Sequence, residues 1–112
     1  MDPKSRTDVP LPLPVRRAMR DISSSVSRWR RLRGLTQAQI AERAGVSRGV
    51  VRRLESGDGG VSIENVLRIL RALGVAELVT DALDPLSSDI GRLRAEQDLP
   101  QRVRPRRLNG AG

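Results

Sequence analysis

The segment LTQAQIAERAGVSRGVVRRLE, residues 35–55, constrains the fold of this chain more than any other stretch of its sequence. It holds two runs of helical pattern on either side of one break, Ala44-Gly45-Val46. Gly45 can take the left-handed conformation that ends a helix, and Ser47 can cap the start of a new one. The segment therefore predicts two short helices joined by a tight turn.

Composition limits both the core and the chemistry. Trp29 is the only aromatic residue among 112, so the core must consist of Leu, Val, Ile and Ala, which favours close-packed helices. The absence of Cys and His excludes disulfides, thiol chemistry, classical zinc sites and histidine acid–base catalysis. The carboxylates are spread along the chain rather than clustered. We expect one small all-α domain with tails, no enzyme activity, no catalytic residue, no metal and no cofactor.

Charge is distributed unevenly along the chain. Residues 28–53 hold eight arginines and one acid, a net charge of +7, within a total of +8. Residues 54–91 carry −5, and residues 92–112 carry +4. A basic block favours a polyanionic partner, although it can also be a solvated face. RNA is disfavoured because aromatic stacking platforms are missing.

Caps and glycines predict five helices, at about residues 21–33, 36–44, 47–56, 62–73 and 76–83, with a weak sixth at 88–97. Thr36 and Gln39 form a Thr-x-x-Gln capping box. Gly91 makes the sixth helix doubtful. The residues expected on the inner faces are Ile22, Val26, Trp29, Ile40, Ala41, Ala44, Val51, Leu54, Ile63, Val66, Leu67, Leu70 and Leu73.

The segment GLTQAQIAERAGVSRGVVRRLESG resembles the phage-repressor/Cro family of helix-turn-helix regulators. Matching features are the Leu-Thr-Gln start, Ala41, Gly45-Val46-Ser47, inward Val51 and Leu54, and the closing Leu-Glu-Ser-Gly. The resemblance covers roughly residues 21–83. It implies a five-helix lambda-repressor-like domain that binds double-stranded DNA as a homodimer on an inverted repeat, with its third helix in the major groove.

The resemblance also assigns roles to particular positions. Arg48 is the first choice for reading a base, because a guanidinium can donate twice to guanine. Gly49 stands where relatives often place a longer polar side chain. The full base-reading set is Arg48, Gly49, Arg52 and Arg53, and the phosphate-binding set is Thr36, Gln37, Ser47 and Arg30. Arg30 and Glu55 match a structural pair, and Asp58 argues against a strong phosphate grip by the following loop.

The flanks predict a flexible proline-containing leader (1–20), the helix-turn-helix domain (21–84), and a weak helix with a basic disordered tail (85–112). The leader could alternatively be a docking arm, since Leu11, Leu13 and Val15 alternate with its prolines and are more apolar than a plain linker needs. A dimer seam is expected on apolar residues beyond the needs of the core: Leu78, Val79, Ala82, Leu83 and Leu86.

The C-terminal half, RALGVAELVTDALDPLSSDIGRLRAEQDLPQRVRPRR, resembles small antitoxin regulators of the HipB type. This resemblance implies a HipA-like serine/threonine kinase toxin as partner and an operon that the regulator represses itself. A stand-alone operon or prophage repressor is the alternative. Without a signal-peptide core or a membrane-length apolar run, we expect the bacterial cytoplasm, with association to the nucleoid when DNA is bound.

Overall fold

The computed structural model describes the backbone of residues 9–102 and the side chains of residues 9–97. This part of the chain is helical and holds no strand. It divides into two compact units, Met1–Val75 and Ala76–Gly112. The predicted helix-turn-helix domain, residues 21–84, spans the boundary between these two units. None of the described helices combines the length and the apolar character needed to cross a bilayer.

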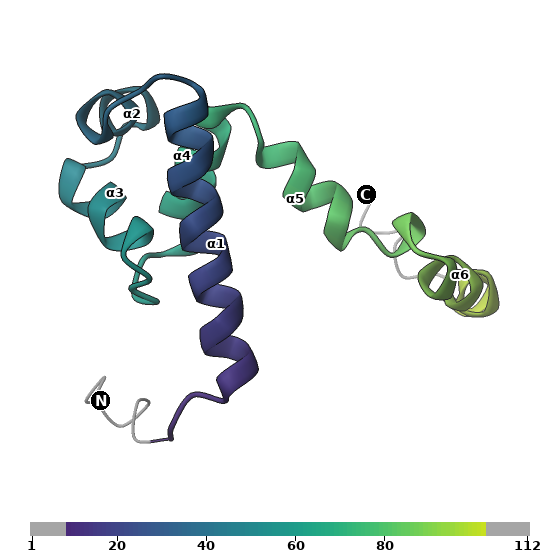
Figure 1. Ribbon diagram of the computed structural model, residues 1–112. Helices are drawn as coiled ribbons and strands as arrows, with labels where there is room; N and C mark the ends of the chain where they lie inside the picture. The colour runs from purple at the N-terminus through teal and green to yellow at the C-terminus, as the bar shows by residue number, and fades with distance from the viewer. Residues whose placement is uncertain (1–8, 103–112) are drawn as a thin grey trace. The chain divides into compact units, whose positions relative to one another are not determined.

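From residue 9 on, the first unit contains four helices, α1 (Leu13–Leu32), α2 (Gln37–Ala44), α3 (Arg48–Glu55) and α4 (Ile63–Leu73). Figure 1 shows α1 as the longest of them, with α3 beside it and α2 at the end where α1 finishes. Helix α2 packs on α3 and α4, and α1 packs on both of those helices as well. The buried apolar residues are Val26, Ile40, Ala41, Ala44, Val51, Leu54, Ile69, Leu70, Leu73 and Val75.

The predicted caps define the ends of α2, α3 and α4. Thr36 and Gln39 form the reciprocal capping box at the start of α2. Ser47 accepts from the Val50 N–H at 3.2 Å, and Ser62 accepts from the Asn65 N–H at 3.1 Å. These bonds satisfy backbone donors that a helix start leaves without intrahelical partners.

Helix α1 begins earlier than predicted, at Leu13 rather than near Asp21, so residues 13–20 of the predicted leader are helical. The predicted helix start was wrong because it assigned Pro14 and the residues after it to the leader. Pro14 lies in the first turn of α1, where a backbone N–H has no intrahelical partner to lose. Residues 1–8 of the predicted leader and residues 103–112 of the predicted tail lie outside the described residues.

Three apolar residues predicted to face inward are exposed, Ile22, Ile63 and Leu67, the last of them by only 37%. Ile22 of α1 is 52% exposed, and Ile63 at the start of α4 is 76% exposed. Periodicity identifies the apolar stripe of a helix but not the width of the neighbouring surface that covers it. Trp29 is half-buried, and the Arg33 guanidinium lies over its ring, 5.3 Å from the centroid.

The second unit contains α5 (Ala76–Leu83), a 3-10 turn η2 (Pro85–Ser87) and α6 (Asp89–Arg102). The described part of the chain thus has six α-helices, not the predicted five. Gly91, which made the sixth helix doubtful, lies where the backbone of α6 closely approaches the backbone of Pro85. A Cβ at this position would overlap the carbonyl group of Pro85. A glycine here therefore permits the packing of α6 on η2.

Candidate nucleic-acid interface

The turn between α2 and α3 is built around Gly45. Its φ of 74° is in the left-handed region, which a glycine adopts without the steric cost of a Cβ. The next residue, Val46, donates its N–H to the carbonyl of Ala41 at 3.0 Å. This bond closes the end of α2 and starts the chain toward the Ser47 cap of α3.

Helix α3 has a buried face and an arginine face. Val51 and Leu54 are buried in the first unit, and Arg48, Arg52 and Arg53 are exposed. The side chains of Arg48 and Arg52 make no hydrogen bond or ion pair with any residue that the structure describes. The buried face fixes the axis of α3, so the arginines extend from a rigid element rather than from a loop.

Gly49 lies between these arginines on the first turn of α3. The nearest neighbour of a Cβ built there is the Ser47 hydroxyl at 3.8 Å, an ordinary van der Waals distance. Packing inside the protein therefore does not require glycine at this position. The small residue leaves open space beside Arg48.

An ion pair that is almost buried connects α1 to the end of α3. Arg30 donates from Nε to Glu55 Oε2 at 2.7 Å and from Nη2 to Oε1 at 3.0 Å. Its Nη1 donates to the carbonyl of Leu35 at 2.9 Å. The side chains are only 14% and 7% exposed. The contacts of Arg30 are thus directed into the protein, and its predicted phosphate contact stays a prediction.

Gln37 joins the same cluster from the start of α2. Its amide Nε2 donates to Glu55 Oε1 at 3.0 Å, an interaction that sequence reasoning missed. The residues predicted to bind phosphate therefore make different contacts within the protein. Thr36 and Ser47 cap helices, while the Gln37 amide donates to Glu55. Arg30, Gln37 and Glu55 together fix α1, α2 and α3 relative to one another, and we call them the Glu55 cluster.

The Glu55 cluster holds its carboxylate in the charged form. Burial alone would raise the pKa of Glu55, but hydrogen bonds from Arg30 and Gln37 and the charge of Arg30 outweigh it and lower that pKa below its ordinary value. The hydrogen bond to Glu55 likewise raises the pKa of Arg30.

This pKa shift predicts a pH dependence of stability. A lowered folded pKa contributes stability above the unfolded pKa of Glu, about 4.3, and the contribution disappears as pH falls through the folded value. We expect the difference in unfolding free energy between the wild type and Glu55→Gln to be smaller at pH 3 than at pH 7. Urea unfolding at both pH values measures it. An equal difference at the two pH values would contradict this account of Glu55.

Arg53, the last arginine of α3, has a partner that the sequence analysis did not predict. Its Nε donates to Asp58 Oδ2 at 2.9 Å, across the end of the helix. The hydrogen bond from Arg53 lowers the pKa of Asp58. The sequence does place an acid five residues after this arginine, at the end of a helix. The contact between Arg53 and Asp58 forms, however, only because the turn after α3 brings their side chains together.

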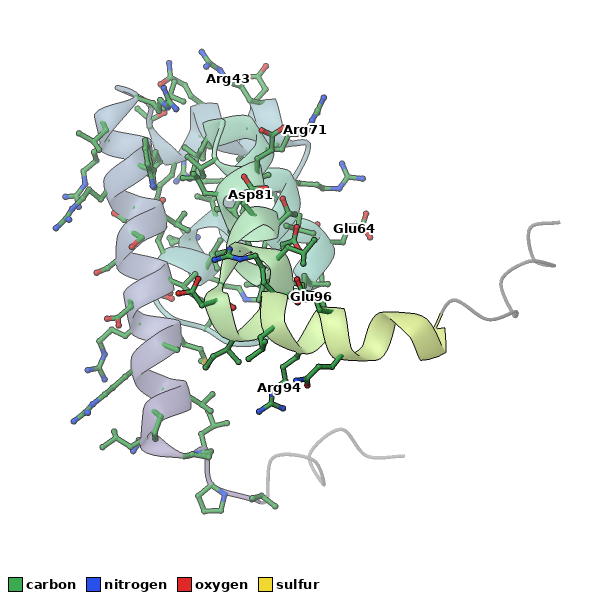
Figure 2. All side chains as sticks on the ribbon, turned by 90° about the vertical axis from the view of Figure 1, so that its right-hand side faces the viewer. Arg43, Glu64, Arg71, Asp81, Arg94 and Glu96 are labelled. Atoms are coloured by element: carbon green, nitrogen blue, oxygen red, sulfur yellow. The ribbon has the colours of Figure 1, made fainter. Side chains whose placement is uncertain are left out.

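In the second unit, the predicted seam residues are all exposed. Leu78, Val79 and Leu83 lie on α5, and Leu83 is 77% exposed. Ile90 and Leu93 of α6 are exposed apolar residues that the predicted seam did not include. No described residue from Ala76 to Gln97 is buried, so this unit presents its apolar side chains rather than enclosing them. Arg94 points away from α6 in Figure 2.

Comparison with known proteins finds one family model that matches the middle of the chain. Residues 26–78 match the model of a family described as helix-turn-helix, over the end of α1, all of α2, α3 and α4, and the start of α5. No curated protein and no solved structure gives a match. The family match supports a phage-repressor-like helix-turn-helix regulator that binds DNA.

Proposed function

We propose that this DNA-binding regulator is a sequence-specific repressor of transcription that binds an inverted repeat in double-stranded DNA. The observation that carries the proposal is the arginine face of α3, which extends from a helix whose opposite face is buried. A helix of this size fits the major groove, where base edges can be distinguished. The +7 block that contains it supplies attraction to phosphates.

In this proposal, side chains of α3 read bases and helix starts grip the backbone. Arg48 donates two hydrogen bonds to one guanine, and Arg52 and Arg53 extend the contact by one turn. The starts of α2 and α3, at Thr36, Gln37 and Ser47, face phosphates with backbone N–H groups, which favour an anion. Arg30 contributes indirectly, because its ion pair in the Glu55 cluster fixes the position of α2 relative to α3.

Selection of bound sequences from random duplex DNA tests this function. We expect the full chain to enrich an inverted repeat whose half-sites are about one helical turn apart, roughly 34 Å. Enrichment of no sequence, with equal binding to all duplexes, would contradict it.

The homodimer is proposed to form through the exposed apolar residues of the second unit. Leu78→Asp with Leu83→Asp places two charges on that surface without removing a buried side chain. We therefore expect a folded monomer that has lost cooperative binding to the inverted repeat. Sedimentation measures the change, with Arg94→Asp as a control that adds an acid on α6. A double variant that sediments as the wild-type dimer would place the interface elsewhere.

We further propose that the chain is the antitoxin of a HipA-like kinase operon and represses that operon itself. The resemblance of the C-terminal half to HipB-type antitoxins supports this, as does the second unit, which carries exposed apolar residues and five acids against two arginines over residues 76–97. Such a surface suits a protein partner better than DNA. The alternative is a stand-alone operon or prophage repressor.

Two observations separate these alternatives. An adjacent kinase gene whose product co-purifies with the full chain would favour the antitoxin, and repression of its own promoter by the chain without such a gene would favour the stand-alone repressor. In both cases the regulator is expected to work in the bacterial cytoplasm, at the nucleoid.

A further inference from the structure

Asp58 holds the guanidinium of Arg53 by one edge. Arg53 donates from Nε to Asp58 Oδ2 at 2.9 Å, and neither Nη1 nor Nη2 donates a hydrogen bond to any residue that the structure describes. An arginine has five N–H donors in a planar fork. Engagement through Nε therefore leaves the two terminal groups to bind something outside the protein.

Asp58 itself is fixed by the backbone. Its other carboxylate oxygen, Oδ1, accepts from the Gly60 N–H at 2.8 Å, and its own N–H donates to the carbonyl of Arg53 at 3.0 Å. Asp58 thus closes the turn that follows α3. Its carboxylate is held in place and does not move with the Arg53 side chain when that side chain changes rotamer. An ordinary surface pair between two mobile side chains lacks this constraint.

We propose that Asp58 is a positioning residue that orients Arg53 to read a guanine in the bound DNA. The inference rests on the proposed function, because it requires α3 to lie in the major groove. Guanine O6 and N7 accept two parallel hydrogen bonds from one guanidinium. Holding Arg53 in advance reduces the conformational freedom that it must lose when it binds that base. Asp58 then sets specificity although it opposes binding to phosphates.

A competing role of Asp58, in which it only neutralises the charge of Arg53, predicts no effect on base specificity. If Asp58 only neutralised Arg53, its removal would increase binding to every duplex equally and leave base preferences unchanged. The orienting role predicts two changes of opposite direction: weaker preference for one guanine and stronger binding to random duplex, because a negative charge near the phosphates is removed.

Asp58→Asn separates the two roles with little change of shape. Its side-chain oxygen can still accept from the Gly60 N–H, so the turn is kept, while its amide presents a donor to Arg53 Nε. Arg53→Lys keeps the positive charge but loses the planar fork. Glu64→Gln is the matched control, since Glu64 forms an exposed ion pair with Arg68 at 3.2 Å and points outward from α4 (Figure 2).

The experiment is selection from random duplex DNA with the full chain and each variant, followed by affinity measurement on the selected sequence. We expect the wild type to prefer guanine at one position by about 10-fold or more. Both Asp58→Asn and Arg53→Lys should reduce that preference to roughly 3-fold or less, and Asp58→Asn alone should also bind random duplex more tightly. Glu64→Gln should retain the wild-type preference.

Three results would overturn the inference. A wild-type motif that Asp58→Asn retains in full would remove the orienting role and leave the proposed function intact. A selected motif in which Arg53→Lys changes no base preference would likewise remove the orienting role and leave the proposed function intact. If the wild type selects no motif while it remains folded, the proposed function fails, and the inference fails with it.

Discussion

Replacement of Glu55 by glutamine lowers the free energy of unfolding by about 3 kcal/mol. The variant removes one charge from a pair whose side chains are 14% and 7% exposed, and so leaves the Arg30 guanidinium without its counter-charge. It also weakens the acceptor of the Gln37 amide. For a domain of this size, the loss corresponds to a fall in Tm of about 12–24 °C. Urea and thermal unfolding of the full chain measure both quantities.

Two controls distinguish this effect from a general loss of charge. Glu64→Gln breaks an exposed pair on α4 and should change the unfolding free energy by at most about 0.5 kcal/mol. Arg30→Met combined with Glu55→Met should recover much of the loss, because an apolar pair leaves no unpaired charge. A change below about 1 kcal/mol for Glu55→Gln alone would show that the Glu55 cluster does not fix these helices.

Replacement of Arg48 by alanine abolishes most of the preference for the cognate operator. The loss of a bidentate contact to guanine costs about 1–3 kcal/mol for each half-site, so a dimer on two half-sites loses about 30-fold in affinity or more. Arg48 is exposed and has no partner among the described residues, so its removal should leave the fold unchanged. Equilibrium binding to the operator and to single-base variants of it measures the change.

Gln37→Ala is the informative comparison. Gln37 lies at the start of α2, where the proposed function gives it a phosphate contact, so its loss should weaken binding to all duplexes alike. Preferences at individual base pairs should survive in Gln37→Ala and disappear at one position in Arg48→Ala. If the two variants share the same base preferences, the division between base-reading and phosphate-binding residues is wrong.

Sequence was sufficient to predict the ends of α2, α3 and α4 because these ends depend on local chemistry. Thr36 and Ser47 cap the backbone within three residues of their own position, and Gly45 and Gly74 end helices through their own dihedral angles. None of these signals requires knowledge of the tertiary fold. The same reasoning failed at Pro14. A helix tolerates a proline there only because the residue lies within the first turn of α1.

Contacts between elements were harder to predict. The resemblance to repressors implied the pair of Arg30 and Glu55, but the donation from Gln37 to the same carboxylate depends on how α2 and α3 pack. The contact of Arg53 with Asp58 likewise requires the turn after α3 to fold back along the helix. The exposure of Ile22 and Ile63 depends on where the neighbouring helices end, which periodicity does not contain.

The most direct test of the central claim, that α3 reads the sequence of duplex DNA, is to titrate the full chain with its selected operator and with a scrambled duplex over a series of salt concentrations. We expect both affinities to fall as salt rises, with a log–log slope of about 0.9 for each phosphate contacted. At physiological salt, the operator should bind at least roughly 10³-fold more tightly than the scrambled duplex. Equal affinity for the two duplexes at every salt concentration would contradict the claim.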